Sequence, residues 1–193
     1  MRPKVRSSTI VGVRHAGKVA LGGDGQVSVG RSIMKTDARK VRTLADGKVL
    51  VAFAGSAGDA AALLERLERK LEDAPGRLRK AAVALAKEWR TDEALRRLDA
   101  LLAVADASAL LLVSASGDVI EPDDGVLGIG AGGAYAAAAA RALVRHARHL
   151  PAATIAEEAL HIAAESCIDT NDHVTVLTID CAEPAAGGPG PGL

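Results

Sequence analysis

The chain has 193 residues, and its 24 Lys and Arg side chains are balanced by 24 Asp and Glu side chains. This balance gives no electrostatic reason to expect nucleic-acid binding, and one Phe, one Trp and one Tyr offer no platform for stacking bases. No apolar run approaches the roughly 18 residues of a membrane-spanning helix. Two isolated cysteines make no disulfide framework, which favours the cytoplasm. The length of the chain fits one compact domain.

The first half of the chain is predicted to form strands followed by two helices. Short runs rich in β-branched residues, separated by Gly or Asp turns, predict strands over residues 9–14, 19–23, 41–45 and 49–54. Leucines at helical spacing predict a helix over residues 58–73, which Pro75 and Gly76 end. A second amphipathic helix is predicted over residues 78–89.

The second half repeats this order of strands and then helices. Strands are predicted over residues 101–105, 109–114, 119–121 and 126–130, helices over 134–146 and 154–166, and a last strand over 173–179. Strands grouped with two helix pairs favour α+β layering over a regular βαβ alternation. Residues 181–193 are rich in Pro and Gly and are predicted to be a disordered tail.

Three hydroxyl residues, Ser7, Ser8 and Thr9, stand at the start of the first predicted strand. A hydroxyl is a weak nucleophile until a base removes its proton, and the α-amino group of an N-terminal residue can be that base. The unperturbed pKa of an α-amino group, about 7.7–8.0, suits general base catalysis near neutral pH. Residues 1–7 lack the apolar core of a secretory signal, so they are either a propeptide removed between Ser7 and Ser8 or a disordered tail left in place.

Two charged residues could complete such a site. A lysine ammonium close to the hydroxyl would favour the alkoxide, and a buried carboxylate would hold that lysine in place. We therefore predict Ser8 as the nucleophile, Lys40 as its electrostatic partner and Asp24 as the residue that orients Lys40. Spacing alone leaves an alternative open, in which the hydroxyl run only enters an edge strand and the two charged residues lie in solvated turns.

From Ser8 to about Ile179 the chain resembles the HslV family, the peptidase subunits of the bacterial HslVU ATP-dependent proteases and relatives of proteasome β-subunits. The segments that carry the resemblance follow the order of the family: STIVGV at 8–13, GDGQ at 23–26, FAG at 53–55, KAAVALAKEWRTD at 80–92, LLAVAD at 101–106, GAGGAYA at 130–136 and CIDTN at 167–171. No single segment is decisive, but the series is specific.

The resemblance implies the fold and the site residues. It implies the four-layer α-β-β-α sandwich of N-terminal-nucleophile hydrolases over residues 8–180. It also implies that residues 1–7 are a propeptide that is removed, with Ser8 rather than Thr9 at the first position of the mature chain. It places an oxyanion-stabilising amide at Gly55. It also implies a site for a monovalent cation such as Na⁺, built from backbone oxygens at Ala164, Cys167 and Thr170.

The resemblance also implies partners. We expect a homo-oligomer of two stacked hexameric rings, an HslU AAA+ ATPase that docks on the rings, and unfolded polypeptides as substrates. The chain itself is expected to bind no nucleotide. Gly128 to Gly133 fits G-x-G-x-x-G, but no acidic residue closes a second strand about twenty residues later, so we interpret these glycines as a tight turn near the nucleophile.

Two positions depart from the pattern of the family. Ser8 stands where the family usually has threonine, and Ala131 stands where it usually has a serine that arranges protons around the nucleophile. A lost hydroxyl in a catalytic network can be worth on the order of 1–3 kcal/mol. Two alternatives therefore stay open: a noncatalytic or weakly active ring subunit, and a small-molecule amidase of the same fold.

Overall fold

The computed structural model describes residues 5–6, 8–55, 57–93, 95, 98 and 100–181. The strands of its first large sheet have the order β10-β9-β8-β7-β6. They are β6 (Val41–Leu44), β7 (Val49–Ala54), β8 (Leu101–Ala105), β9 (Leu110–Ser114) and β10 (Val119–Ile120). The second sheet has the order β11-β2-β3-β12. Its strands are β2 (Thr9–His15), β3 (Lys18–Gly23), β11 (Val126–Gly130) and β12 (Thr175–Asp180).

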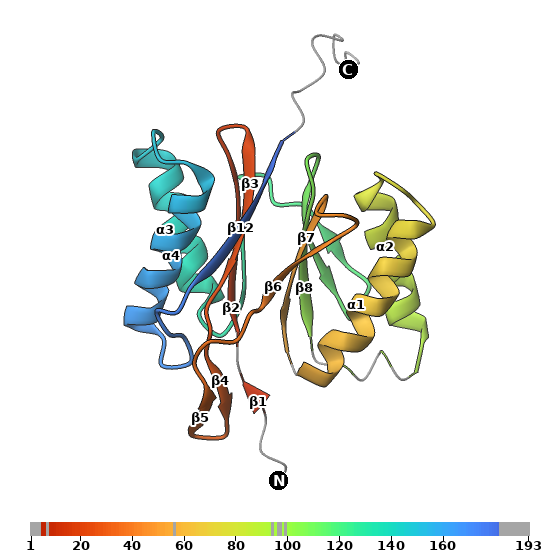
Figure 1. Cartoon of the computed structure of the whole chain (residues 1–193), viewed down its shortest axis with the longest axis horizontal. Helices are drawn as coiled ribbons and strands as arrows, with labels where there is room; N and C mark the ends of the chain where they lie inside the picture. Colours follow the sequence, from red (N-terminus) through yellow and green to blue (C-terminus); the bar gives the residue numbers. More distant parts are fainter. Residues whose placement is uncertain are drawn as a thin grey trace.

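Each large sheet carries a pair of helices on its outer face, as Figure 1 shows. Helices α1 (Ala57–Glu72) and α2 (Leu78–Thr91) cover the five-stranded sheet, and α3 (Gly133–His146) and α4 (Ala152–Ser166) cover the four-stranded sheet. The result is the four-layer α-β-β-α sandwich that the resemblance implied.

Three apolar clusters hold the layers together. The central cluster lies between the two sheets and joins Ile10 and Leu21 of one to Leu50 and Leu110 of the other. The cluster under α1 and α2 contains the fully buried Trp89, whose indole N–H donates to the Leu95 carbonyl at 3.0 Å. The cluster under α3 and α4 is rich in alanine, which lets these helices pack closely on each other and on the sheet.

All four predicted helices and nine predicted strands are present, with ends shifted by at most two residues. Helix α4 begins at Ala152, two residues earlier than predicted, directly after Pro151. Proline has a fixed φ near −65° and no N–H, so it suits a helix start. Strand β12 begins at Thr175, two residues later than predicted.

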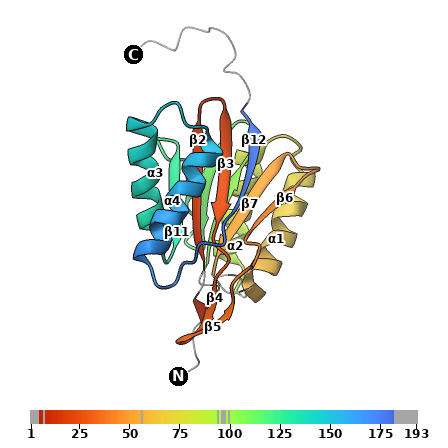
Figure 2. The same ribbon diagram turned by 60° about the vertical axis from the view of Figure 1, so that its left-hand side comes forward.

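The sequence analysis did not predict the small sheet of β1 (Val5–Arg6), β4 (Val27–Val29) and β5 (Ser32–Lys35). Its β4–β5 hairpin projects from one end of the sandwich, as Figure 2 shows. Strand β1 belongs to the predicted propeptide and pairs antiparallel with β4, Val5 opposite Val29. The other residues of the predicted propeptide, and the predicted tail beyond Cys181, lie outside the described residues.

Candidate active site

The β2–β3 hairpin brings the start of the first strand to the end of the second. Ile10 pairs with Gly23, so Ser8 and Thr9 on one side come next to Asp24 on the other. The Asp24 backbone N–H donates to the Thr9 carbonyl at 3.1 Å. Two residues that are distant in sequence therefore meet at the same end of the sheet.

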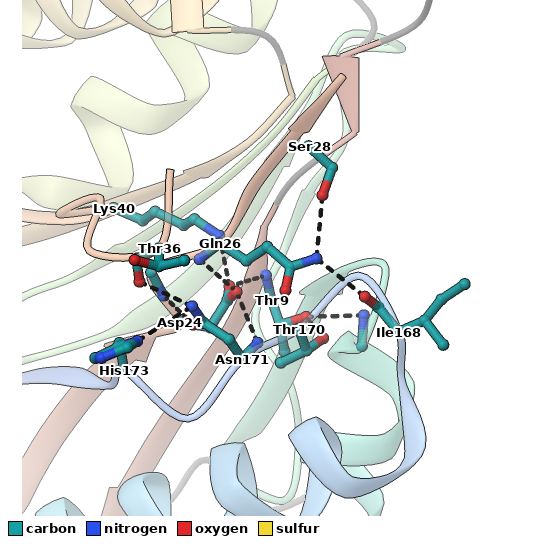
Figure 3. Close-up of polar contacts among 12 residues, drawn as sticks. Thr9, Asp24, Gln26, Ser28, Thr36, Lys40, Ile168, Thr170, Asn171 and His173 are labelled. Atoms are coloured by element: carbon teal, nitrogen blue, oxygen red, sulfur yellow. Dashed lines mark hydrogen bonds and ion pairs between the residues drawn. The ribbon is translucent and has the colours of Figure 1, made fainter. Parts of the chain in front are cut away.

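The carboxylate of Asp24 is fully buried and holds four hydrogen-bond donors (Figure 3). Its Oδ1 accepts from the Lys40 ammonium at 2.6 Å and from the Thr9 amide at 2.7 Å. Its Oδ2 accepts from the backbone N–H of Gln26 at 3.0 Å and from the backbone N–H of Asn171 at 3.4 Å. A buried charge is tolerated when it is paired and hydrogen-bonded in this way. Because Oδ1 serves both Lys40 and Thr9, the carboxylate fixes the ammonium relative to the strand that Ser8 precedes.

Burial lowers the pKa of Lys40 below that of a solvated lysine. Desolvation of the ammonium is the largest cause, and the charge and hydrogen bond of Asp24 oppose it. The side chain of Lys40 is only 7% exposed. A lysine in this setting loses its proton more easily than a surface lysine, while the ion pair with Asp24 favours the ammonium form, which can stabilise negative charge nearby.

Three of the predicted site residues line one cavity of about 160 Å³. Ser8 directly precedes β2, Lys40 lies in the segment before β6, and Gly55 directly follows β7. The remaining walls are largely apolar, with two arginines among them: Val27, Ala38, Arg39, Arg42, Val51, Ala52, Phe53, Ala60 and Leu64. The fourth predicted residue, Asp24, is joined to this cavity through its ion pair with Lys40.

The alternation of side chains along β2 separates Ser8 from Thr9. Successive residues of a strand face opposite sides of the sheet. Ile10 lies in the cluster between the sheets and Val11 in the cluster under α3 and α4, so Thr9 faces the helices. The Thr9 side chain is fully buried, and its hydroxyl is bonded to Thr170 at 2.6 Å. Ser8, and not Thr9, is among the residues that line the cavity.

The turn after β11 approaches the backbone of Ser8 closely. The Ala131 N–H donates to the Ser8 carbonyl at 3.0 Å. Gly130 has φ +86°, and a Cβ built on it would lie 1.7 Å from the Ser8 carbonyl oxygen. This contact supports the interpretation of the Gly-rich segment as a tight turn against the nucleophile. Ala131 brings only its backbone N–H to this contact, because its side chain carries no hydroxyl.

The residues predicted to hold a cation lie at the end of α4. The helix ends at Ser166 and is capped by Cys167, whose carbonyl accepts the Thr170 N–H at 3.0 Å. Ala164 and Thr170 line a shared hollow. Among the described residues no group of three His, Cys, Asp or Glu side chains could hold a metal. The cation site of backbone oxygens stays a prediction.

The sequence analysis assigned no role to three groups that the structure places beside the site. These are the Thr9 hydroxyl, the Thr170 hydroxyl and the side chain of Asn171. The Asn171 Oδ1 accepts the Gly25 N–H at 3.0 Å, and its Nδ2 donates to the Thr36 carbonyl at 2.8 Å. Asn171 lies 147 residues after Asp24, so no local pattern in the sequence could have predicted that the Asn171 backbone N–H bonds to Asp24.

Comparison with known proteins gives the same result as the geometry. The family model of proteasome subunits matches residues 5–179. The solved structure of eukaryotic HslV from Trypanosoma brucei is 45% identical, covers 89% of this chain and 99% of its own, and superposes with a TM-score of 0.85. Thiobacillus denitrificans BPH in complex with epoxomicin is 22% identical, covers 91% of this chain and 100% of its own, and has a TM-score of 0.73. A second structure of that protein gives a TM-score of 0.72.

The α-β-β-α sandwich, with a hydroxyl residue at the head of β2, defines an N-terminal-nucleophile hydrolase fold. The chain belongs to the proteasome subunit family, and it is an HslV-like, proteasome-β-like peptidase subunit. None of the helices in the described part of the chain has the length and apolar character needed to span a membrane.

Proposed function

We propose that the mature protein is an endopeptidase whose nucleophile is Ser8 after residues 1–7 have been removed. One observation carries the proposal: Ser8, Lys40 and Gly55 line the same cavity, and the buried Asp24 carboxylate holds Lys40 there at 2.6 Å. The Thr9 hydroxyl is already bonded to Thr170 and to the Gly132 N–H, which makes it the poorer candidate for the nucleophile.

The chemistry is acyl transfer in two halves. The free α-amino group of Ser8 accepts the Oγ proton while Oγ attacks the scissile carbonyl carbon. The Gly55 N–H stabilises the resulting oxyanion, and the protonated amine gives its proton to the leaving amine as the peptide bond breaks. Water, deprotonated by the same amine, then hydrolyses the ester on Ser8. Lys40 stabilises negative charge on Oγ throughout, and Asp24 keeps it in place.

Removal of the propeptide is part of this proposal, because an amide nitrogen cannot act as the base. In the uncut chain the strand Val5–Arg6 pairs with β4. The bond between Ser7 and Ser8 ends at the nitrogen of the residue whose hydroxyl would attack it. We propose that the same site cuts this bond in the assembled protein. Oγ of Ser8 attacks the Ser7 carbonyl carbon while a water molecule takes its proton and passes it to the Ser8 nitrogen as the C–N bond breaks, and a second water then hydrolyses the ester and leaves the free amine.

The proposed partners rest on the likeness to HslV. The protein would assemble as two stacked hexameric rings in the cytoplasm, dock an HslU ATPase and degrade the unfolded polypeptides that HslU delivers. ATP hydrolysis would belong to the partner. Residues 12–18 fit the first part of the phosphate-binding motif G-x-x-x-x-G-K-[ST], but Val19 stands where the motif needs Ser or Thr. The segment also forms the β2–β3 hairpin, whereas the motif leads from a strand into a helix. A monovalent cation would be held by the backbone oxygens of Ala164, Cys167 and Thr170, where it would supply positive charge at the end of α4.

The test compares wild type with Ser8→Ala and Ser8→Thr in the hydrolysis of an unfolded protein, with and without HslU and ATP. Wild type should degrade the substrate only with both additions, Ser8→Thr should remain active, and Ser8→Ala should be inactive. Activity of Ser8→Ala equal to wild type would refute the proposal. Processed but inactive wild type would favour a noncatalytic ring subunit, and turnover of small amides without HslU would favour an amidase.

A further inference from the structure

The position of Ser8 in the mature protein depends on Thr9, its only covalent neighbour. The first residues of a chain fray unless they are tied down. A nucleophile must nevertheless be placed within a fraction of an ångström of its productive geometry, and small misplacements cost orders of magnitude in rate. Something in the fold must therefore fix Thr9.

Thr9 is held by its backbone and by its side chain. Its N–H donates to Asp24 Oδ1 at 2.7 Å, and its carbonyl accepts the Asp24 N–H at 3.1 Å. Its hydroxyl accepts the Gly132 N–H at 2.9 Å and is bonded to the Thr170 hydroxyl at 2.6 Å. Thr9 is fully buried and Thr170 is 5% exposed, so water does not compete for these bonds.

The Thr170 hydroxyl comes from the loop after α4, 161 residues along the chain. The same loop donates the Asn171 N–H to Asp24 at 3.4 Å, and its Ile168 carbonyl accepts from the Gln26 side chain at 2.9 Å. Figure 3 shows these groups side by side around Thr9 and Asp24. One loop thus contacts both the residue next to the nucleophile and the carboxylate that holds Lys40.

There is little room for this contact to be replaced by another. A Cβ built on Gly132 would lie 2.5 Å from both threonine hydroxyl oxygens. The close packing means that the two hydroxyls can shift little without moving the backbone of Thr9. Neither threonine is among the residues that line the cavity with Ser8. A change in rate on substituting either one would therefore not come from a lost contact with substrate in that cavity.

We propose that the Thr9 and Thr170 hydroxyls form a positioning pair that sets Ser8 for attack. This inference rests on the proposed function, since it assumes that Ser8 is the nucleophile. The pair does not react and does not bind substrate. It holds the residue after the nucleophile against the loop that also supports Asp24, so that the hydroxyl and the amine of Ser8 reach the cavity in a fixed orientation.

The test uses the full chain, assembled and activated as in nature, with Thr9→Val, Thr170→Val, the double variant, Thr9→Ser and Thr170→Ser. Thr178→Val makes the same change on the exposed surface of β12 and serves as the matched control. A peptide epoxyketone, which reacts with a terminal hydroxyl and amine, titrates the active sites. The kcat per titrated site and the KM are measured on a fluorogenic peptide, with the pH profile of kcat/KM.

Each valine variant should lose about tenfold in kcat per titrated site, the factor that corresponds to ~1.4 kcal/mol, with KM within about twofold of wild type. The pH profile should keep its shape, because the base is unchanged. Both serine variants should recover most of the rate. The double variant should be no slower than the slower single variant, because both changes remove the same hydrogen bond.

Two results would overturn the positioning pair. One is a kcat per titrated site equal to wild type in Thr170→Val, which would show that the contact serves only stability. The other is a double variant slowed by the product of the two single effects. If Thr9→Val does not fold, Thr170→Val and Thr170→Ser still decide the question. Failure of the proposed function is distinguished by Ser8→Ala, which would then retain activity whatever the threonine variants do.

Discussion

Replacing Asp24 by Asn should destabilise the protein and abolish its activity. The variant keeps the shape of the side chain but removes the charge that pairs with Lys40 at 2.6 Å. It also replaces one acceptor oxygen by an NH₂ group, which cannot accept a hydrogen bond. In wild type Oδ2 accepts the backbone N–H groups of Gln26 and Asn171. The ammonium of Lys40, 7% exposed, would then be a buried charge without its counter-ion.

The magnitude follows from the burial of this pair. Breaking one partner of a buried ion pair typically costs about 3–5 kcal/mol, because the remaining charge is left uncompensated. This is a large part of the roughly 5–15 kcal/mol that a domain has in total. Urea unfolding at pH 7 should therefore show Asp24→Asn to be about 3 kcal/mol less stable or worse. Asp123→Asn, the same change at an exposed aspartate, should differ from wild type by less than about 0.5 kcal/mol.

The pH dependence gives a second readout. The pKa of Lys40 in the folded protein is already lowered by burial, and the variant removes the two opposing effects of Asp24, so it falls further. Between its folded pKa and its unfolded pKa the unfolded state binds the additional proton, so stability rises with pH. Asp24→Asn should therefore gain more stability than wild type on going from pH 7 to pH 9. The double variant Asp24→Asn with Lys40→Met should recover stability at pH 7 but not activity.

The reasoning about this ion pair would be refuted by a simple result. If the free energy of unfolding of Asp24→Asn at pH 7 is within about 1 kcal/mol of the wild-type value, and the variant still cleaves substrate at the wild-type rate, the buried pair neither stabilises the fold nor positions Lys40. A loss of stability without any loss of kcat per titrated site would contradict the catalytic half alone.

Two further substitutions test other parts of the structure. Gly130→Ala should lose nearly all activity, because its Cβ would lie 1.7 Å from the Ser8 carbonyl oxygen. The control is Gly47→Ala, which is also at positive φ but in open space. It should cost only backbone strain of about 1 kcal/mol and leave kcat unchanged. Glu88→Gln should lower the free energy of unfolding by about 1 kcal/mol at pH 7, since Glu88 bridges α1 and α2 through Arg66 and Lys70. The pKa of Glu88 is lowered in the folded protein, mainly by its hydrogen bond to Lys70. The difference in free energy of unfolding between wild type and Glu88→Gln should therefore be fully present above the unfolded-state pKa of Glu88. It should vanish as the pH falls through the folded-state pKa, which urea unfolding at acid pH would show.

The helices and the long strands could be predicted from the sequence because their own periodicity specifies them. Leu63, Leu67 and Leu71 repeat at helical spacing and are all buried in the cluster under α1 and α2. Strands β4 and β5 were missed because they are short, and every residue of β5 is exposed, so no alternation of apolar and polar residues marks it.

The site was predictable only in part. The chemistry of the residue types suggested Ser8, Asp24 and Lys40, and the resemblance added Gly55 and favoured this interpretation over solvated turns. The structure places Ser8, Lys40 and Gly55 around one cavity, with Asp24 bonded to Lys40. The support from the loop after α4 could not be predicted, because it joins residues more than 140 positions apart through single hydrogen bonds. Contacts of this kind depend on how the layers pack, which local patterns do not encode.

The most direct test of the whole account is the mass of the mature protein, taken before and after treatment with a peptide epoxyketone. The account predicts a chain that begins at Ser8 and gains one inhibitor, which peptide mapping places on residue 8. A proteolytically active protein that still begins at Met1, or an adduct on any other residue, would contradict it.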